Sequence, residues 1–448
     1  MTAGTTVLGT GTLRATAAPR VLAVADSDSY LKWAAWTLAR LRDDGGQDGG
    51  GQDDRGQDDG GQDGGAAPRV SAVLVRSPIA PTPGQASAAV AGTGLAPPPV
   101  LGTAAQRRLL RRTRPDVVLV AATGPVAELV ARQAAGVRAG RRPALVTGLP
   151  GMALPATTHG TGWRRWCDAF VVHAAVEAGP YAEAFAAHGA APELVLTRLP
   201  FLDPAPPVPS AEHGVGIVID PDNDPHPVFG GKARVGRVVL AAQAKVPASR
   251  DDRVALLDGL AKLSRGGLEV VVKLRARAGE RQTHNEEHPL DALWAAERAR
   301  LGHPEGAVRF ATGPMSDHLV PGTALLTVSS TAALESLARG LPTIFLTDFG
   351  VGPGLLNEPF AGSGCLRRLD EVAATLRAGG PTPDPAWCAE HYLQSAPSQL
   401  PAAVAALAAR ARAGELPGRA VTPWSWPRHT YTVVRSALPV RVARALRR

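Results

Sequence analysis

The sequence predicts an α/β protein built from two doubly wound domains. Short, almost uninterrupted apolar runs alternate with stretches of helical spacing, and a proline-rich segment divides this alternation into two halves. Such strands are typical of parallel sheets that helices cover on both faces. With 448 residues, the chain is long enough for two full-sized cores. We therefore expect two Rossmann-like domains that face each other across a cleft at the carboxyl ends of their strands.

The first domain is predicted over residues 20–202, after a disordered N-terminus at 1–19. Its expected helices carry apolar residues three or four positions apart. Strands are predicted at residues 21–25, 70–75, 117–122, 144–147, 169–172 and 194–196, and helices at 30–41, 126–137 and 176–188. Residues 44–65 contain only Gly, Gln, Asp and one Arg, so we predict a disordered insertion over 43–66.

The second domain is predicted over residues 236–380. The proline-rich residues 203–235 interrupt the alternation and are interpreted as a linker. Strands are then expected at residues 238–242, 269–274, 308–310, 325–328 and 343–346. Residues 381–448 are predicted to form a helical segment with a basic tail, whose last helix covers 431–446.

The net charge of +8 is unevenly distributed. Residues 401–448 hold nine arginines and one acidic residue, whereas residues 43–64 hold eight aspartates and one arginine. The arginines of the tail are expected on a solvated helix face, with contact to phosphates or to an anionic membrane surface as the alternative. Neither aromatic interleaving nor a nucleic-acid-binding module accompanies them, so we expect no nucleic-acid partner.

The sequence also bears on location. Its first twenty residues lack the basic start and apolar core of a secretory signal, and no apolar run approaches the roughly 18 residues needed to span a bilayer. The three cysteines are widely spaced and odd in number, which suits a reducing compartment and offers no metal framework. We expect a cytoplasmic protein, membrane-associated only through its basic tail.

Polar residues follow four successive strands of the second domain, where parallel strands would direct them toward one crevice. They are Gln243 and Lys245, then Lys273, Arg275 and His284, then His318, and finally Ser329, Ser330 and Thr331. One hydroxyl suffices to cap a helix, so three in succession indicate an anionic or hydroxyl-rich ligand. Only five of the 48 basic residues are lysines, and a compact ammonium retained at a strand end suits a phosphate. The alternative is a surface strand end with snorkelling side chains.

The segment SSTAALESLARGLPTIFL (329–346) resembles the donor-site strand–helix–strand unit of GT-B glycosyltransferases and their sugar-nucleotide epimerase relatives. The shared features are a hydroxyl-rich helix start, an early glutamate and a Gly-Leu-Pro turn into the next strand. VLAVADSDSYLKWA, CDAFVVH and VVLAAQAKVPASRDDR extend the resemblance to an actinobacterial family of glycosyltransferases that is otherwise catalogued as a domain of unknown function. The resemblance covers about residues 20–395 and implies a GT-B-like fold.

The resemblance also implies roles at the donor site. Ser329, Ser330 and Thr331 would contact the phosphates of a nucleotide-sugar donor, helped by backbone N–H groups. Glu335 would accept hydrogen bonds from ribose hydroxyls, the alternative being a solvated helix glutamate. The remaining donor-binding residues would be Lys245, Lys273 and Arg275, which neutralise the departing pyrophosphate, and His284 and His318, the latter near the nucleobase or ribose.

The first domain would supply the acceptor side and a base, because an inverting transfer needs a group that takes the acceptor's proton. Asp26 and Asp28 follow the first predicted strand, and His159 lies in a loop rich in glycine and proline. The alternative for Asp28 is that it, or Ser27, caps the following helix. The residue pairs 123–124 and 147–148 are expected to line the same cleft.

We interpret the chain as a glycosyltransferase that moves a sugar from a nucleotide-activated donor to an acceptor hydroxyl of a glycan, lipid or small molecule, with no metal or cofactor. The alternatives are a sugar-nucleotide epimerase and a non-catalytic nucleotide-binding protein. A haloacid-dehalogenase-like phosphatase is a distant alternative, suggested by Asp26 and Asp28 after the first strand. No glycines flank Ser329 as they flank the nucleophile of a hydrolase elbow, so we do not expect Ser329 to be a nucleophile. No GxGxxG follows the first strand, which argues against a Rossmann dehydrogenase.

Overall fold

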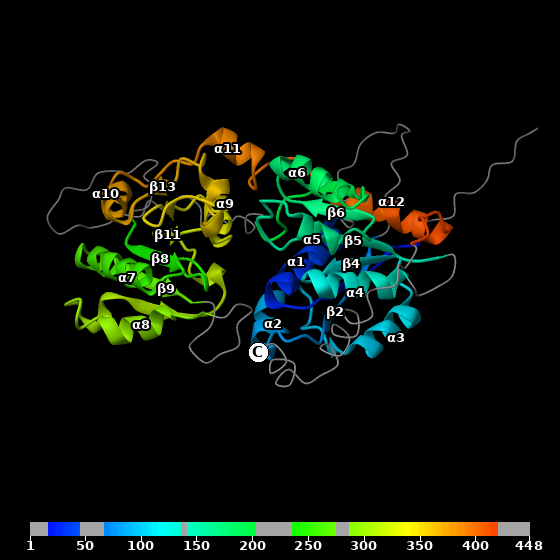
Figure 1. Cartoon of the computed structure of the whole chain (residues 1–448), viewed down its shortest axis with the longest axis horizontal. Coiled ribbons are helices and arrows are strands. Elements are labelled where there is room, and N and C mark those ends of the chain that lie inside the picture. Colours follow the sequence, from blue (N-terminus) through cyan, green and yellow to red (C-terminus); the bar gives the residue numbers. More distant parts are fainter. Residues whose placement is uncertain (1–16, 45–66, 136–140, 203–234, 275–285, 420–448) are drawn as a thin grey trace, which may run out of the picture.

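The computed structural model describes residues 17–44, 67–135, 141–202, 235–274 and 286–419. In this part of the chain the strands form two sheets, which lie side by side in Figure 1. The first has the strand order β3-β2-β1-β4-β5-β6-β7 and the second β10-β9-β8-β11-β12-β13, with every neighbouring pair parallel. The order reverses beside the first strand of each sheet, as in doubly wound folds. The prediction of two Rossmann-like domains is confirmed.

The first sheet consists of seven strands with helices between them. The strands are β1 (Arg20–Ala25), β2 (Arg69–Val75), β3 (Val100–Leu101), β4 (Val117–Ala121), β5 (Ala144–Gly148), β6 (Ala169–Val172) and β7 (Glu193–Leu196). The helices are α1 (Asp28–Asp44), α2 (Pro83–Val90), α3 (Thr103–Thr113), α4 (Gly124–Ala135), α5 (Thr158–Gly162) and α6 (Ala175–Ala186). The central strands β4 and β5 are buried at every residue, because helices cover both faces of the sheet.

The second sheet repeats this plan with six strands. They are β8 (Arg237–Ala241), β9 (Glu269–Lys273), β10 (Arg309–Ala311), β11 (Thr323–Thr327), β12 (Thr343–Leu346) and β13 (Leu366–Arg367). The helices of this half and of the following segment are α7 (Arg250–Arg265), α8 (Leu290–Glu297), α9 (Ala332–Ala338), α10 (Val372–Arg377), α11 (Pro385–Glu390) and α12 (Leu400–Ala413).

Each strand predicted from the sequence lies within two residues of an observed one. The two strands without a prediction, β3 and β13, have only two residues each and lie at sheet edges, too short to show a periodic pattern. Almost all of the predicted disordered segments and linker, and the whole of the last predicted helix, lie outside the described residues.

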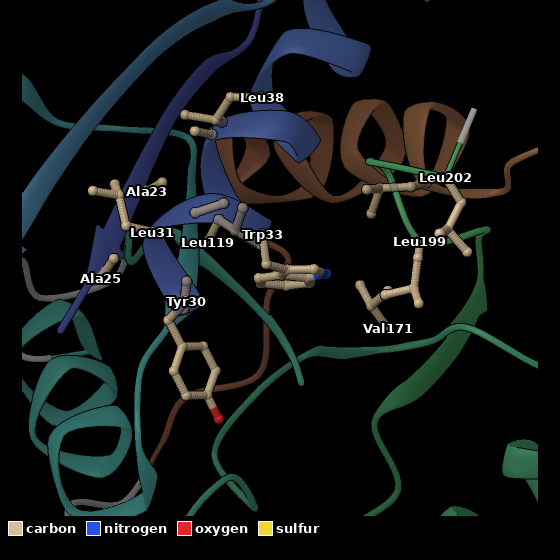
Figure 2. Packing of buried hydrophobic residues seen from close by; sticks show 14 of the residues in the cluster. Ala23, Ala25, Tyr30, Leu31, Trp33, Leu38, Leu119, Val171, Leu199 and Leu202 are labelled. Atoms are coloured by element: carbon tan, nitrogen blue, oxygen red, sulfur yellow. The ribbon is translucent and has the colours of Figure 1, made fainter. Parts of the chain in front are cut away.

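Trp33 is central to the core of the first domain. Figure 2 shows its ring extending from α1 toward Val171 and Leu199. The indole is fully buried, and its Nε1 donates a hydrogen bond of 2.9 Å to Nε2 of His173. Burial lowers the pKa of His173, so this ring stays neutral and can accept that bond. The first helix is thereby fixed against the last strands of its own sheet.

The chain returns from the second domain to the first before its last described helix. Figure 1 shows α12 (orange-red) lying along the first domain. Before it, the hydroxyl of Tyr392 donates a hydrogen bond of 2.7 Å to Oε1 of Glu177. Glu177 is fully buried and also accepts hydrogen bonds from the backbone N–H groups of His173 at 2.7 Å and Ala153 at 3.1 Å. The returning segment therefore completes the hydrogen bonding of a buried carboxylate in the first domain.

Two arginines of the C-terminal region form ion pairs with the first domain. Arg412 contacts Asp116 at 2.9 Å, and Arg419 contacts Asp168 at 3.0 Å. The expectation of a solvated helix face is wrong for these two residues, because sequence alone does not show that α12 lies over the first sheet. No helix in the described ranges is both long and apolar enough to cross a membrane.

Tyr392→Phe is expected to lower the free energy of unfolding by about 1.5–3 kcal/mol, because it removes a hydrogen bond to a buried charged acceptor. Tyr181→Phe is the matched control. The Tyr181 hydroxyl donates to the neutral carbonyl of Ala153 at 2.7 Å, so its loss should cost only about 0.5–1.5 kcal/mol. Urea denaturation measures both values. A loss at Tyr392 no larger than the loss at Tyr181 would show that Glu177 does not depend on the returning segment.

Candidate functional site

The strand order of the first sheet reverses between β1 and β4, where Asp26 and Thr123 follow the two strands. Asp26 is fully buried. Its Oδ2 accepts hydrogen bonds from the Thr123 hydroxyl and, at 3.1 Å, from the Thr123 backbone N–H. Its Oδ1 has no hydrogen-bond partner among the residues that the structure describes. Asp26 thus joins the two strand ends and keeps one oxygen unused.

The environment of Asp26 changes its ionisation. Burial raises its pKa to about 6, while hydrogen bonds from Thr123 and the charge of Arg164 limit the rise. Nη2 of Arg164 is held by the Tyr30 hydroxyl and the Ala122 carbonyl, both at 2.8 Å. A carboxylate with such a pKa is suited to proton transfer near neutral pH. Because Asp26 is fully buried, it meets no substrate in the conformation observed here.

The other two predicted bases differ in exposure. Asp28 is the first residue of α1 and is half-buried, and its carboxylate accepts a hydrogen bond of 3.4 Å from the Ser29 hydroxyl. Its position at the helix start agrees with the alternative role of stabilising that helix. His159 lies exposed in α5, and its Nε2 accepts a hydrogen bond of 3.2 Å from Nε1 of Trp163. Asp28 and His159, unlike Asp26, are in contact with solvent.

Indole rings cover the glycines that were expected to line the cleft. A β-carbon at Gly148 would lie 2.8 Å from Cζ2 of Trp33, and one at Gly124 would lie 2.7 Å from Cγ of Trp163. Thr147 is fully buried. These positions serve close packing, and only glycine leaves room for the rings. The expectation is therefore wrong for residues 147–148, which are buried, whereas residues 123–124 are half-buried and their place in the cleft stays a prediction.

The strand order of the second sheet reverses between β8 and β11, where Gln243 and Ser329 follow the two strands. Oε1 of Gln243 accepts a hydrogen bond of 2.9 Å from the Ser329 backbone N–H, and its Nε2 donates one of 2.9 Å to the Ser329 hydroxyl. Ser329 is only 5% exposed. This hydroxyl is therefore already used to join two strand ends, as Thr123 joins them in the first sheet.

The next two hydroxyls are more accessible than Ser329. Ser330 and Thr331 are both half-buried. The Ser330 backbone N–H donates to the Thr327 hydroxyl at 3.1 Å, and the Ser330 hydroxyl accepts from the Ala332 N–H at 3.2 Å. The Ser330 hydroxyl proton is not needed for that bond and can be donated to a ligand. Of the three predicted hydroxyls, Ser329 is therefore structural, while Ser330 and Thr331 are accessible to solvent.

Arg253 of α7 holds the loop that follows β8. It is 1% exposed, and its Nη2 donates to the carbonyls of Gln243 at 3.0 Å and Ala244 at 2.8 Å. Its Nε donates to the Pro247 carbonyl at 2.8 Å, and its Nη1 contacts the carboxylate of Glu286 at 2.6 Å. A buried guanidinium with bonds at all three nitrogens is stable only in this geometry. Arg253 therefore positions the loop that carries Gln243 and Lys245.

The domains touch through the helices that follow β1 and β11, the strands beside which each strand order reverses. Nζ of Lys32 in α1 lies 2.7 Å from Oε1 of Glu335 in α9, and 4.3 Å from the centre of the Phe201 ring. A β-carbon at Gly151, just beyond β5, would lie 2.7 Å from Cγ2 of Thr331. We call Lys32, Gly151, Thr331 and Glu335 the interdomain contact. It places Glu335, predicted to contact ribose, against the first domain.

The remaining donor-site predictions fall at different places. Lys245 is exposed after β8, and Lys273 is the last residue of β9 and half-buried. His318 is half-buried, with Nε2 3.5 Å from the Thr312 carbonyl oxygen. Arg275 and His284 lie outside the described residues. Ser329, Ser330, Thr331 and Glu335 lie together at the start of α9, whereas Lys245, Lys273 and His318 lie at the ends of other strands.

Sequence reasoning missed Lys32 as a residue of this site and did not assign Gln243 its structural role. Gln243 carried a signal, since it follows a strand of the second domain, but its pairing with Ser329 required knowing that β8 and β11 are neighbours. Lys32 carried only the rarity of lysine in this chain. Its partner is 303 positions away, and no local pattern indicates such a contact.

Two parallel, doubly wound sheets that meet at the segments after their strands, with a final helix returning to the first sheet, define a protein of the GT-B-like class. The chain belongs to the family described as "Putative glycosyltransferase (DUF6716)", whose model matches residues 21–407. No curated protein matches it.

Solved structures resemble the chain at low sequence identity. A UDP-N-acetylglucosamine 2-epimerase has a TM-score of 0.50 and 12% identity, over 91% of this chain and 99% of its own. The UDP-GlcNAc 2-epimerase from Methanocaldococcus jannaschii has a TM-score of 0.47 and 9% identity, over 84% and 97%. The glycosyltransferase SnogD from Streptomyces nogalater has a TM-score of 0.38 and 16% identity, over 95% and 99%. The likeness to the first structure, at 12% identity, concerns the fold alone.

Asp26→Asn is expected to change how stability depends on pH. The folded pKa of about 6 exceeds the ordinary value of 3.8, so the unfolded chain loses this proton first as pH rises. The free energy of unfolding should therefore fall by about 3 kcal/mol between roughly pH 4 and pH 6 and stay lower above that range. The asparagine variant should lack this component. Urea denaturation from pH 4 to 8 checks it, and parallel profiles for the two proteins would contradict it.

The interdomain contact predicts an energetic coupling between Lys32 and Glu335. The lysine side chain is 33% exposed and the glutamate 11%, so we expect a coupling on the order of 1 kcal/mol. A double-mutant cycle with Lys32→Met and Glu335→Gln, measured by denaturation, gives this value. If the effects of the two substitutions simply add, the ion pair does not hold the domains together.

Proposed function

We propose that the protein transfers a sugar from a nucleotide-activated donor to an acceptor hydroxyl at the interdomain contact. The observation that carries the proposal is the ion pair of Lys32 with Glu335, since it joins the helix after β1 to the helix after β11. Ligands of doubly wound sheets bind at strand-order reversals, and here the helices that follow two such reversals are in contact. Membership of the glycosyltransferase family supports the same reading.

The donor's phosphates would contact Ser330 and Thr331. Ser329 is committed to Gln243, whereas Ser330 and Thr331 are half-buried and can present hydroxyl protons to an anion. Helix α9 has only seven residues, so we assign the contact to the hydroxyls and not to a helix dipole. Lys245 and Lys273, at neighbouring strand ends, would approach to neutralise the leaving diphosphate, where negative charge develops.

Glu335 would bind the ribose of the nucleotide. Its Oε1 is held by Lys32 at 2.7 Å, which fixes the carboxylate and leaves Oε2 to accept a hydrogen bond from a ribose hydroxyl. Lys32 then stays beside the donor as a positive charge contributed by the first domain. Closure of the two domains would in this way depend on the same carboxylate that recognises the donor.

Asp28 is the proposed base. The acceptor oxygen would attack the anomeric carbon as its proton passes to the carboxylate, and the bond from that carbon to the diphosphate would break with its electron pair leaving on the diphosphate. Asp28 is preferred to Asp26 because it is in contact with solvent and lies one helical turn before Lys32. Asp26 would position the strand end, and His159 is the second proposed base.

A thermal-shift panel of nucleotides and nucleotide-sugars tests donor binding. At least one nucleoside diphosphate or its sugar should raise the melting temperature, and Glu335→Gln should weaken its binding about tenfold. Glu305→Gln is the matched control, since its side chain is 86% exposed elsewhere in the second domain. If no nucleotide or nucleotide-sugar in the panel stabilises the protein, the donor-site proposal is overturned.

Turnover distinguishes the proposed reaction from the alternatives. Asp28→Asn should reduce sugar transfer about a hundredfold or more with donor affinity unchanged, because a base contributes to the reaction and not to binding. Asp43→Asn, at the other end of the same helix, is the control. Conversion of the donor sugar in the absence of any acceptor would indicate an epimerase. Donor binding without either reaction would indicate a non-catalytic nucleotide-binding protein.

A further inference from the structure

A second group of basic residues lies at the opposite end of the first sheet, where its strands begin. A pocket of about 240 Å³ opens there, beside the residues that precede β4 and β5 and the end of α12. Its charged lining residues are Arg20, Arg114, Arg141, Arg142, Arg412 and Asp116. Because β1 has six residues of about 3.3 Å rise each, Arg20 at the start of this strand lies about 20 Å from Asp26 at its end. We call it the basic pocket.

The carboxylates near the basic pocket do not balance its arginines. Asp116 accepts hydrogen bonds from both Arg20 and Arg412. Burial alone would raise the pKa of Asp116, but the bonds from Arg412 and Arg20 outweigh burial and lower it, so this residue stays ionised and fully engaged. Arg142 makes a bidentate ion pair with Asp168 at 2.6 and 2.7 Å. These pairs form one wall of the pocket and add no free negative charge.

Two arginines of the basic pocket have no such partner. Arg114 and Arg141 are exposed, and their guanidinium groups form no hydrogen bond or ion pair with any residue in the described ranges. Several guanidinium groups around a small concavity repel each other unless an anion lies between them. Guanidinium groups also match the geometry of phosphate oxygens, to which they can donate two parallel hydrogen bonds.

Arg114 occupies a backbone conformation that glycine usually adopts. It follows α3 with φ of 47° and ψ of 60°, in the left-handed region, and its N–H bonds to the Leu110 carbonyl. An arginine here costs on the order of 1 kcal/mol relative to a residue without a β-carbon. A side chain retained against such strain indicates a use for the side chain, since the helix end itself would be better served by glycine.

The surface around the basic pocket is also positive. Helix α3 contains no acidic residue and carries four exposed arginines, none of which forms an ion pair within the described part of the chain. These residues are Arg107, Arg108, Arg111 and Arg112. They would raise the local concentration of anions without lining the pocket.

We propose that the basic pocket is a binding site for a phosphate group, separate from the donor site and opposite to it. Arg114 and Arg141 would donate to the phosphate oxygens, and the ion pairs of Arg20, Arg142 and Arg412 would keep the pocket wall in place. The phosphate can belong to a small soluble anion or to the headgroup of an anionic lipid. This proposal does not depend on the proposed glycosyl transfer.

Calorimetric titration of the full-length protein with inorganic pyrophosphate tests the soluble source. Arg141→Gln should weaken binding at least tenfold. The matched control is Arg112→Gln, which removes the same charge from α3 outside the pocket and should change affinity less than twofold. Weakening by Lys245→Gln without weakening by Arg141→Gln would place the bound pyrophosphate at the donor site and overturn the proposal. Equal weakening by Arg141→Gln and Arg112→Gln would reduce the proposal to general charge attraction and overturn it.

Arg114→Gly separates binding from folding. Because glycine suits the left-handed conformation, this variant should keep or raise the melting temperature while weakening pyrophosphate binding at least tenfold. Undiminished binding by this variant would overturn the role of Arg114.

Co-sedimentation with phosphatidylglycerol vesicles, with phosphatidylcholine vesicles as control, tests the lipid source. Vesicle binding that Arg141→Gln reduces and Arg112→Gln does not would assign the phosphate to a lipid. Binding of pyrophosphate alone would assign it to a soluble anion. Failure of both probes would overturn the proposal.

Discussion

Parallel strand pairing is the constraint on which the rest of this structure depends. Each of the two described sheets has all its neighbouring strands parallel, so the segments after the strands collect at one edge and the segments before them at the other. Asp26 with Thr123, and Gln243 with Ser329, occupy corresponding places in the two sheets, where a polar side chain after one strand binds the end of its neighbour. The proposed transfer site lies where the strands end, and the basic pocket lies where the strands of the first sheet begin.

Buried charge is concentrated where chain segments must be held in place. Glu177 receives hydrogen bonds from its own domain and from Tyr392 of the returning segment, and Arg253 binds several carbonyls of the loop after β8. A buried charge is tolerated only when its hydrogen bonds are satisfied, so each of these residues imposes one local geometry. Asp26 differs because burial raises its pKa to about 6, and its hydrogen bonds from Thr123 only limit that rise.

The interdomain contact connects this scaffold with the proposed chemistry. Lys32 and Glu335 come from different domains, and the same glutamate is the proposed ribose ligand. Thr331 packs so closely on Gly151 that no side chain fits between them. Donor recognition and domain closure would then involve the same few residues, as expected for a transferase that must exclude water from the reacting centre.

Much of the fold could be predicted because strands and helices leave periodic patterns in the sequence. The apolar runs located the strands to within two residues, and only the two-residue edge strands β3 and β13 left no pattern. The candidate site was predictable only in part. The polar residues after the strands were found, but the same sequence pattern included Ser329, which is structural, and Thr147 and Gly148, which are buried. Exposure depends on neighbours far away in the chain, and no local pattern contains that information.

The amino-acid sequence by itself determined the two parallel α/β domains, the positions of the strands and the set of polar residues at their ends, because these follow from local periodicity and from the short reach of backbone hydrogen bonds. Tertiary structure decided which of those residues act together. It paired Lys32 with Glu335 across 303 positions, buried Asp26 while leaving Asp28 in contact with solvent, and bound Arg412 and Arg419 to the first domain. These outcomes depend on desolvation and on contacts between domains, which exist only once both sheets have formed and packed.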